Sequence, residues 1–452
     1  MKEELIRKDL KYIWHPYTQM KDCEELPPIP IARAEGMKLF GYDGNFYYDT
    51  ISSWWCNVHG HNHPVIKEAI KTQIDSLEHV LFAGFTHAPA VGLAERLVGM
   101  TPGSLTKVFF SDNGSTAVEV AMKMSLQYWH NIGKGYRNKF LSLDMAYHGD
   151  TVATMNISGV DLFNKKFKPL FFGSFKAPAP YCYRCPLGKE GGSCSLECLK
   201  AVDDILEENS GDIAAVTVEP LLMAAGGMIV YPVEYLKGLR ELCSKYDVHL
   251  IADEVATGFG RTGKMFACEH AGIEPDFMCL SKGITSGYLP IGATLTTDKV
   301  FNAFYDDHEK LKTFYHGHTY TANPIACAAA IASIDLFEKE NTLDRVGRIN
   351  ERLAVFLEEM SDLSIVGDTR SIGVVGAMEL VKNRATKEPF GMNERIGIEV
   401  YKLGLENGLL LRPLGNIIYF FLPLCAKPEE LEQIFHRASK VMKIAEKRVL
   451  YP

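Results

Sequence analysis

Short apolar runs alternate with amphipathic segments between residues 61 and 325. The clearest runs are residues 107–111, 139–143, 214–218, 249–252 and 277–280, each followed by polar or glycine-bearing residues. Continuous apolar runs of this length are typical of strands that are buried on both faces. The segments between them show helical spacing, as in residues 65–77. The alternation predicts an α/β fold in which helices flank a mostly parallel sheet.

The pattern changes at both ends of the chain. Residues 1–60 contain short strand-like runs around the turn at Asp43 and Gly44, which indicates a small meander. An alanine-rich helix over 326–336 leads into two long helices and short strands, one of them at 417–421. We therefore expect a large domain over 61–325 and a smaller α+β domain over 326–452, to which the segment 1–60 contributes.

Composition narrows the possible functions. The 452 residues are 47% hydrophobic and carry a net charge of -8, with Lys and Arg dispersed along the chain. The chain can bury a large core, and it lacks the basic patches typical of proteins that bind nucleic acid or anionic membranes. The charged N-terminus lacks the apolar core of a signal peptide, and no apolar run is long enough to cross a bilayer. These features predict a cytoplasmic protein with reduced cysteines that acts on small molecules.

An acidic and a basic residue follow two of the apolar runs. Asp253 comes directly after the run 249–252, and Lys282 follows the run 277–280. The carboxyl ends of parallel strands meet at one edge of a sheet, where α/β proteins bind ligands. A lysine amine can bind the aldehyde of pyridoxal 5'-phosphate (PLP), and a carboxylate can pair with its ring nitrogen. The pair predicts a PLP site, although an ordinary ion pair is the alternative from these two residues alone.

A turn of small residues follows the run 107–111. Residues 112–117 include Gly114 and Ser115 and open a helix over 118–124. Backbone N–H groups and the helix dipole at such an N-terminus bind anions, here the PLP phosphate. The alternative is a simple Ser or Thr cap.

Three other side chains are candidates for positions around the cofactor. Tyr147, after the run 139–143, would stack on the ring, unless it is a core tyrosine. Glu219, after the run 214–218, would restrain nearby groups by hydrogen bonding or pair with a structural arginine. The glycine-rich segment 258–263 predicts a tightly folded loop that fixes the guanidinium of Arg261.

Residues 253–264 together with 279–284 resemble the signature of the class III aminotransferases, which are fold-type I PLP enzymes. The segments 14–20, 52–55, 59–64, 147–151 and 266–270 resemble the branch of that class that serves biotin biosynthesis. The resemblance extends from Trp14 to about Pro423. It implies the fold-type I transferase fold and the conversion of 8-amino-7-oxononanoate to 7,8-diaminononanoate.

The resemblance also implies roles for individual residues. Lys282 would bind PLP and shuttle the proton, Asp253 would pair with the pyridinium nitrogen, and Tyr147 would stack on the ring. Gly114 and Ser115 would hold the phosphate, beside His318. Thr319 would reach the phosphate of a neighbouring subunit, which implies a homodimer.

The implied substrate pocket contains Tyr17, Trp54 and Arg412, with Gly317, Tyr147 and Lys282. Aromatic walls and one arginine suit an aliphatic keto acid with a distant carboxylate. Core packing is the alternative for Trp54, and a surface cation is the alternative for Arg412. His318 replaces the proline of many relatives, which leaves both S-adenosylmethionine and lysine as possible amino donors.

Two other functions are compatible with parts of the sequence. One is a different class III aminotransferase, acting on ornithine, 4-aminobutyrate or an ω-amino acid with pyruvate, against which the segments around Tyr17 and Trp54 argue. The other is a regulatory protein without turnover that binds PLP or a metal. Residues 1–60 contain no DNA-binding module typical of regulators that bind PLP.

Four of the eleven cysteines cluster in a segment rich in Pro and Gly. Cys182 and Cys185 are followed, after eight residues, by Cys194 and Cys198. Two such pairs are compatible with a tetrahedral zinc site, with an iron–sulfur cluster, or with four reduced thiols. PLP chemistry has no task for a metal, so we expect no catalytic metal.

Overall fold

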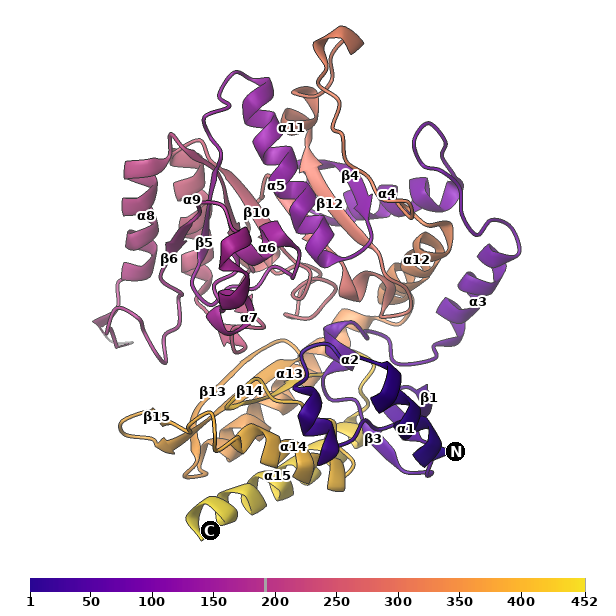
Figure 1. Ribbon diagram of the computed structural model, residues 1–452, viewed down its shortest axis with the longest axis vertical. Coiled ribbons are helices and arrows are strands. Elements are labelled where there is room, and N and C mark those ends of the chain that lie inside the picture. The colour runs from indigo at the N-terminus through magenta and orange to yellow at the C-terminus, as the bar shows by residue number, and fades with distance from the viewer. Residues whose placement is uncertain (191–192, 452) are drawn as a thin grey trace.

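The computed structural model describes residues 1–190 and 193–451, and a seven-stranded sheet forms the centre of its larger part (Figure 1). From one edge to the other, the sheet contains β4 (Leu105–Ser111), β12 (Gly292–Thr297), β11 (Phe277–Leu280), β10 (His249–Asp253), β7 (Ile213–Val218), β5 (Lys139–Leu143) and β6 (Phe175–Ala177). The pairs from β11 to β6 are parallel, whereas β12 is antiparallel to both of its neighbours. The predicted mostly parallel sheet is confirmed.

All five apolar runs form strands of this sheet. The sequence reading missed β6, which is only three residues long, and β12, whose threonines interrupt the apolar pattern. Because β10 and β11 are adjacent and parallel, Asp253 at the end of one strand and Lys282 after the other lie at the same edge.

Helices cover both faces of the sheet (Figure 1). The predicted helix at 118–124 is the middle of the longer helix α5 (Gly114–Asn131), which begins at the small-residue turn. The other helices and 3-10 turns of this part are α3 (Pro64–Ile74), α4 (Ala88–Met100), α6 (Val152–Ile157), α7 (Asp161–Asn164), η2 (Lys165–Leu170), α8 (Glu197–Asn209), α9 (Val233–Lys245), α10 (Cys268–Ala271), η4 (Lys282–Thr285), α11 (Asp298–Asn302) and η5 (His308–Lys310). A hairpin of β8 (Leu222–Met223) and β9 (Ile229–Val230) follows β7.

The smaller part is built around an antiparallel sheet. It consists of β13 (Val366–Ile372), β14 (Val375–Asn383), β15 (Glu388–Pro389) and β16 (Ile417–Phe421), with β14 paired to the other three strands. The helices of this region are α12 (Pro324–Lys339), α13 (Thr342–Ser361), α14 (Ile396–Glu406) and α15 (Pro428–Leu450). The two long helices predicted here are α13 and α15. Among the helices of the described residues, none is both long and apolar enough to cross a membrane.

The N-terminal segment lies beside this smaller part (Figure 1). Its strands β1 (Ile31–Glu35), β2 (Lys38–Gly41) and β3 (Phe46–Tyr48) form the predicted meander, and α1 (Lys2–Tyr12), η1 (Met20–Glu24) and α2 (Ser52–Trp55) are additional. The N–H of Tyr48 donates to the carbonyl of Gly408 (2.9 Å), and the N–H of Leu410 donates to the carbonyl of Tyr48 (3.0 Å). These bonds join the segment to the C-terminal part, while the domain boundaries near residues 60 and 325 stay a prediction.

Candidate active site

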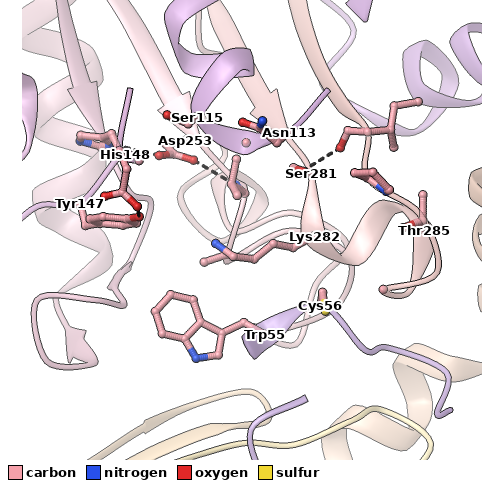
Figure 2. Close-up of a pocket in the computed structure, with 18 of the residues that line it drawn as sticks. Trp55, Cys56, Asn113, Ser115, Tyr147, His148, Asp253, Ser281, Lys282 and Thr285 are labelled. Carbon is pink, nitrogen blue, oxygen red and sulfur yellow. Dashed lines mark hydrogen bonds and ion pairs between the residues drawn. The ribbon is translucent and has the colours of Figure 1, made fainter. Parts of the chain in front are cut away.

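A cavity of about 610 Å³ lies at the carboxyl ends of β10 and β11 and at the N-terminus of α5. Figure 2 shows the side chains of Lys282, Asp253, Tyr147 and Trp55 directed toward it from different elements. Of the predicted cofactor residues, five line this cavity: Gly114, Ser115, Tyr147, Asp253 and Lys282.

Lys282 lines the cavity at the start of η4. Its side chain is half-buried, and its Nζ lies 5.0 Å from the ring centroid of Trp55. Burial lowers the pKa of the Lys282 amine, while the charges of Asp253 and Glu219 partly oppose this effect. A lowered pKa increases the share of neutral amine, which is the form that can attack a carbonyl or accept a proton.

Asp253 does not form an ion pair with Lys282 in the described structure. Instead, Nδ1–H of His148 donates to Oδ2 of Asp253 (2.8 Å), and the N–H of Val255 donates to Oδ1 (3.1 Å). Both the carboxylate and the imidazole are buried, and Nε2 of His148 has no partner among the described residues. The aspartate is thus held in a fixed orientation at the cavity while the lysine amine stays available.

Glu219 is a second buried carboxyl group beside the cavity. It accepts hydrogen bonds from the N–H groups of Tyr147 and Ala224, both at 3.0 Å. Burial, together with the nearby charge of Asp253, raises the pKa of Glu219 to about 8. These two hydrogen bonds restrain the loop that carries Tyr147. Within the described residues, no arginine forms an ion pair with Glu219.

The N-terminus of α5 faces the same cavity. Asn113 is the N-cap: its side chain accepts from the N–H of Thr116 (3.0 Å), and Oγ1 of Thr116 accepts from the N–H of Asn113 (3.1 Å). The cap is therefore an asparagine, and the sequence-based alternative of a Ser or Thr cap is wrong. The N–H groups of Gly114 and Ser115 lie in the first helical turn, where they have no intrahelical partner.

Ser115 is fixed by neighbours from the loop after β5. Its hydroxyl lies 2.8 Å from Oγ1 of Thr151 and 2.9 Å from Oγ1 of Thr154, and it accepts from the N–H of Thr151 (3.1 Å). A Cβ added to Gly149 would lie 2.3 Å from Oγ of Ser115. The loop and the helix start therefore form one closely packed turn, and a helix N-terminus of this kind suits an anion.

The residues at this cavity fit the pyridoxal phosphate expected from the sequence. The turn at α5 suits its phosphate, the buried carboxylate of Asp253 suits a protonated ring nitrogen, and the Lys282 amine suits its aldehyde. The flat ring of Tyr147 lines the cavity, as expected of a side chain that stacks on the cofactor ring.

Three of the predicted substrate residues form a cluster at the side of this cavity. The guanidinium of Arg412 lies 4.9 Å from the ring centroid of Trp54, and the rings of Trp54 and Tyr17 are 5.7 Å apart in an edge-on arrangement. Nη2 of Arg412 also donates to the carbonyl of Tyr17 (3.4 Å). Trp54 is 39% exposed and Arg412 is half-buried, so neither alternative, a core tryptophan or a free surface cation, describes them.

Tyr17 connects the cluster with the first cavity. Its hydroxyl donates to Asp150 (2.6 Å) and lies 3.3 Å from the hydroxyl of Tyr147, which donates to the other oxygen of Asp150 (2.9 Å). Burial raises the pKa of both phenols, so they stay protonated donors. Tyr17 and Arg412 also line a second cavity of about 730 Å³.

The predicted residues Gly317, His318 and Thr319 line neither of these two cavities. Nδ1 of His318 lies 2.8 Å from Oδ2 of Asp112, just before the turn at α5, and Nε2 lies 3.2 Å from Nε2 of His316. Gly317 and Thr319 are exposed. A single chain therefore does not bring Gly317 or Thr319 to the Lys282 cavity.

The glycine-rich segment 258–263 forms the predicted tight loop, and the guanidinium of Arg261 is fixed as expected. Arg261 is buried, and it donates to Oγ of Ser52 and to the carbonyls of Leu422, Trp55 and Asn57, at 2.7–3.1 Å. It thereby holds α2 and Trp55, which is 3% exposed and lines the cavity.

The cavity wall also contains residues that the sequence reading did not assign to the site, among them Trp55, Cys56, Asn113 and His148. His148 adjoins Tyr147, but its bond to Asp253 links residues 105 positions apart, and no spacing in the sequence indicates it. Asn113 could have been identified as the N-cap from its position before the helix.

Comparisons with known proteins agree over nearly the whole chain. The Aminotransferase class-III family model matches residues 20–442. The chain is 49% identical to an adenosylmethionine-8-amino-7-oxononanoate aminotransferase of Geobacter sulfurreducens over 94% of both chains. A protein of the same name from Aquifex aeolicus is 45% identical over 98% of this chain and 97% of its own.

Solved structures show the same fold. A crystal structure of an adenosylmethionine-8-amino-7-oxononanoate aminotransferase from Methanocaldococcus jannaschii has a TM-score of 0.93 and 41% identity, over 98% of this chain and 99% of that one. An omega transaminase from Pseudomonas jessenii in complex with PMP also has a TM-score of 0.93, with 32% identity and the same coverage.

Proposed function

The chain belongs to the class III aminotransferase family, and on that premise we propose that it converts 8-amino-7-oxononanoate to 7,8-diaminononanoate in biotin biosynthesis. The relatives that are 41–49% identical to it carry the name of this reaction. The observation that carries the proposal is the Lys282 amine, free of an ion pair within the described residues, in one cavity with Asp253 and the turn at α5.

The proposed cofactor is pyridoxal 5'-phosphate. When bound, it supplies an electron sink that makes the hydrogen on the amine-bearing carbon of a substrate acidic. Gly114 and Ser115 would hold its phosphate, Asp253 would pair with its ring nitrogen, and Tyr147 would cover one face of its ring. His148 supports the role of Asp253, because its bond to Oδ2 keeps the carboxylate aimed into the cavity.

Lys282 is the proposed acid–base residue. Burial lowers the pKa of its amine, so Nζ can accept a proton from the substrate carbon and return it to a neighbouring atom. The negative charge of Asp253 counteracts this lowering, which keeps the protonated form accessible as well.

The arrangement of the two cavities supports an elongated substrate. The keto carbon would lie at Lys282, and the distant carboxylate would reach Arg412 past Tyr17 and Trp54. Tyr17 stands at the junction, since its hydroxyl contacts Tyr147 and its ring contacts Trp54. A single arginine held over an aromatic ring can bind a carboxylate through two parallel hydrogen bonds.

Gly317 and Thr319 enter the proposal through a second copy of the chain. Both are exposed, and neither lines the Lys282 cavity of its own chain. We propose a homodimer in which Thr319 reaches the phosphate site of the neighbouring subunit, with His318 beside it. We take S-adenosylmethionine as the amino donor, with lysine as the alternative that His318 leaves open.

The test is the absorption spectrum of the purified, PLP-loaded protein during separate additions of diaminononanoate, S-adenosylmethionine and lysine. Each true substrate must convert the cofactor from its aldehyde to its amine form. A response to diaminononanoate and to one donor supports the proposal and identifies the donor. A response only to ornithine or 4-aminobutyrate would refute it.

Two lysine variants make this test specific. Lys282→Ala should abolish the spectral response to every substrate. Lys176→Ala is the matched control, because Lys176 is also a half-buried lysine whose pKa is lowered by desolvation, to about 8, and it lies outside the cavity. Equal loss of the response in both variants would indicate a general effect of losing a half-buried lysine.

A further inference from the structure

A long irregular loop connects β6 with α8. It spans residues 178–196 and contains no strand or α-helix among the described residues. Loops of this length without regular structure are uncommon in compact domains and usually have a function or an added constraint. Three of the clustered cysteines lie in this loop, and the fourth, Cys198, lies in the first turn of α8.

The fold brings all four cysteines to one small cavity. Cys182, Cys185, Cys194 and Cys198 line a space of about 30 Å³, which is too small for an organic ligand. All four are free thiols, and two of them, Cys182 and Cys194, are exposed. Four cysteine sulfurs are a donor set that zinc prefers in structural sites.

We propose that Cys182, Cys185, Cys194 and Cys198 bind one zinc ion as a structural site. Each cysteine would lose its thiol proton when its sulfur binds the metal, and four thiolates with one divalent cation leave a net charge of -2. Lys189 and Glu190 also line the cavity, and Nζ of Lys189 pairs with Glu197 (3.1 Å), so these side chains add no net positive charge beside the thiolates. In the described residues no three potential ligands already stand in metal-binding geometry, so binding requires the thiols to rotate toward the cavity.

The proposed site has a task in the structure, because the residues between the first two cysteines fasten the loop to the small domain. Arg184 pairs with Glu379 of β14 and donates from Nη1 to the carbonyl of Lys387 (2.8 Å). Nζ of Lys387 in turn donates to the carbonyl of Tyr183 (2.8 Å). Tyr181, which precedes Cys182, donates to Glu379 as well.

These contacts reach the sheet of the small domain from a loop of the large domain. A metal bound to the cysteines on either side of Tyr183 and Arg184 would fix the conformation of this loop. Structural zinc contributes directly to the stability of the segment that it ties together. The proposed zinc site does not depend on the reaction proposed for Lys282.

The experiment is elemental analysis of the full-length, cofactor-loaded protein, purified under reducing conditions and passed through a weak chelator. We expect about one zinc per chain, lost in the double variant Cys182→Ser with Cys185→Ser. Cys327→Ala is the control and should retain the zinc, because Cys327 is a buried thiol of α12, outside the cluster.

A second measurement uses the unmutated protein, in case the variants fail to fold. Removal of zinc with a strong chelator should make the loop 178–196 sensitive to a protease, and added zinc should restore protection. The proposal is wrong if the protein contains no metal, if iron replaces zinc, if thiol counts reveal disulfides among these cysteines, or if the double variant keeps the metal.

Discussion

Gly149 allows the loop after β5 to pack against the start of α5, so Gly149→Ala should disturb the turn proposed to bind the cofactor phosphate. An alanine Cβ at this position would lie 2.3 Å from Oγ, 2.5 Å from Cβ and 2.9 Å from Cα of Ser115. Rotation of the serine side chain relieves only the first of these contacts, because Cβ and Cα are fixed to the helix. The first turn of α5 must therefore move.

Two costs add up in this variant. Gly149 has a φ of +124°, which a side chain disfavours by about 1–3 kcal/mol. Overpacking against Ser115 costs roughly another 1–3 kcal/mol. Gly84→Ala is the matched control, since Gly84 has a φ of +88° and an added Cβ would meet nothing within 4 Å.

The assay is the dissociation constant for PLP of each cofactor-free variant, together with its thermal unfolding midpoint. If overpacking against Ser115 displaces the turn, Gly149→Ala should bind PLP about 5- to 150-fold more weakly than Gly84→Ala. This range is the overpacking cost of roughly 1–3 kcal/mol, converted at about 1.4 kcal/mol for each factor of ten. Equal PLP affinity in the two variants would refute the role of this contact in shaping the turn.

Further outcomes concern the carboxyl group beside the cavity and two arginines. Burial raises the pKa of Glu219 from 4.5 to about 8. Between these pH values the folded state holds a proton that the unfolded state has lost. The stability of the cofactor-free protein should therefore fall as the pH rises through this range. Glu219→Gln should flatten this dependence of the thermal midpoint between pH 5 and 8; an unchanged slope contradicts the assignment. Arg412→Ala should weaken binding of 8-amino-7-oxononanoate by about 1.5–3 kcal/mol with PLP binding intact. Arg352→Ala serves as the control for Arg412 in equilibrium binding, because Arg352 is also half-buried, pairs with Glu432 and lines neither cavity. Unchanged affinity of Arg412→Ala would remove Arg412 from the pocket. Arg261→Met should lower the thermal midpoint of the cofactor-free protein strongly, because the carbonyls of Trp55, Asn57 and Leu422 lose a buried donor; a midpoint equal to that of the unmutated protein contradicts this role.

The sequence predicted the parts of the site that depend on strand order. Asp253, Lys282 and the turn at α5 follow apolar runs, and the parallel pairing of β10 with β11 is enough to bring the first two together. Contacts that depend on side-chain direction were not predictable. The bond between His148 and Asp253 requires knowledge of where each side chain points, which the periodicity of a sequence does not contain.

The different placement of the adjacent Trp54 and Trp55 could not be predicted from the sequence, because the backbone of α2 is left-handed. Ser52, Ser53, Trp54 and Trp55 all have positive φ values, between 44° and 73°. Each such residue costs roughly 1–2 kcal/mol, and tryptophan is an unusual residue in this conformation. The turn separates the two rings: Trp54 contacts Tyr17 and Arg412, while Trp55 lines the Lys282 cavity.

A strained turn of this kind persists only where its surroundings fix it. Arg261 does so from one side through Ser52 and the carbonyl of Trp55, and Asp49 does so from the other by accepting from the N–H and the hydroxyl of Ser53. The glycine-rich loop that presents Arg261 therefore has a structural task that its sequence does not reveal. It stabilises the turn that places Trp55 in the Lys282 cavity and Trp54 beside Arg412. The strained residues therefore lie where both halves of the proposed substrate would be bound.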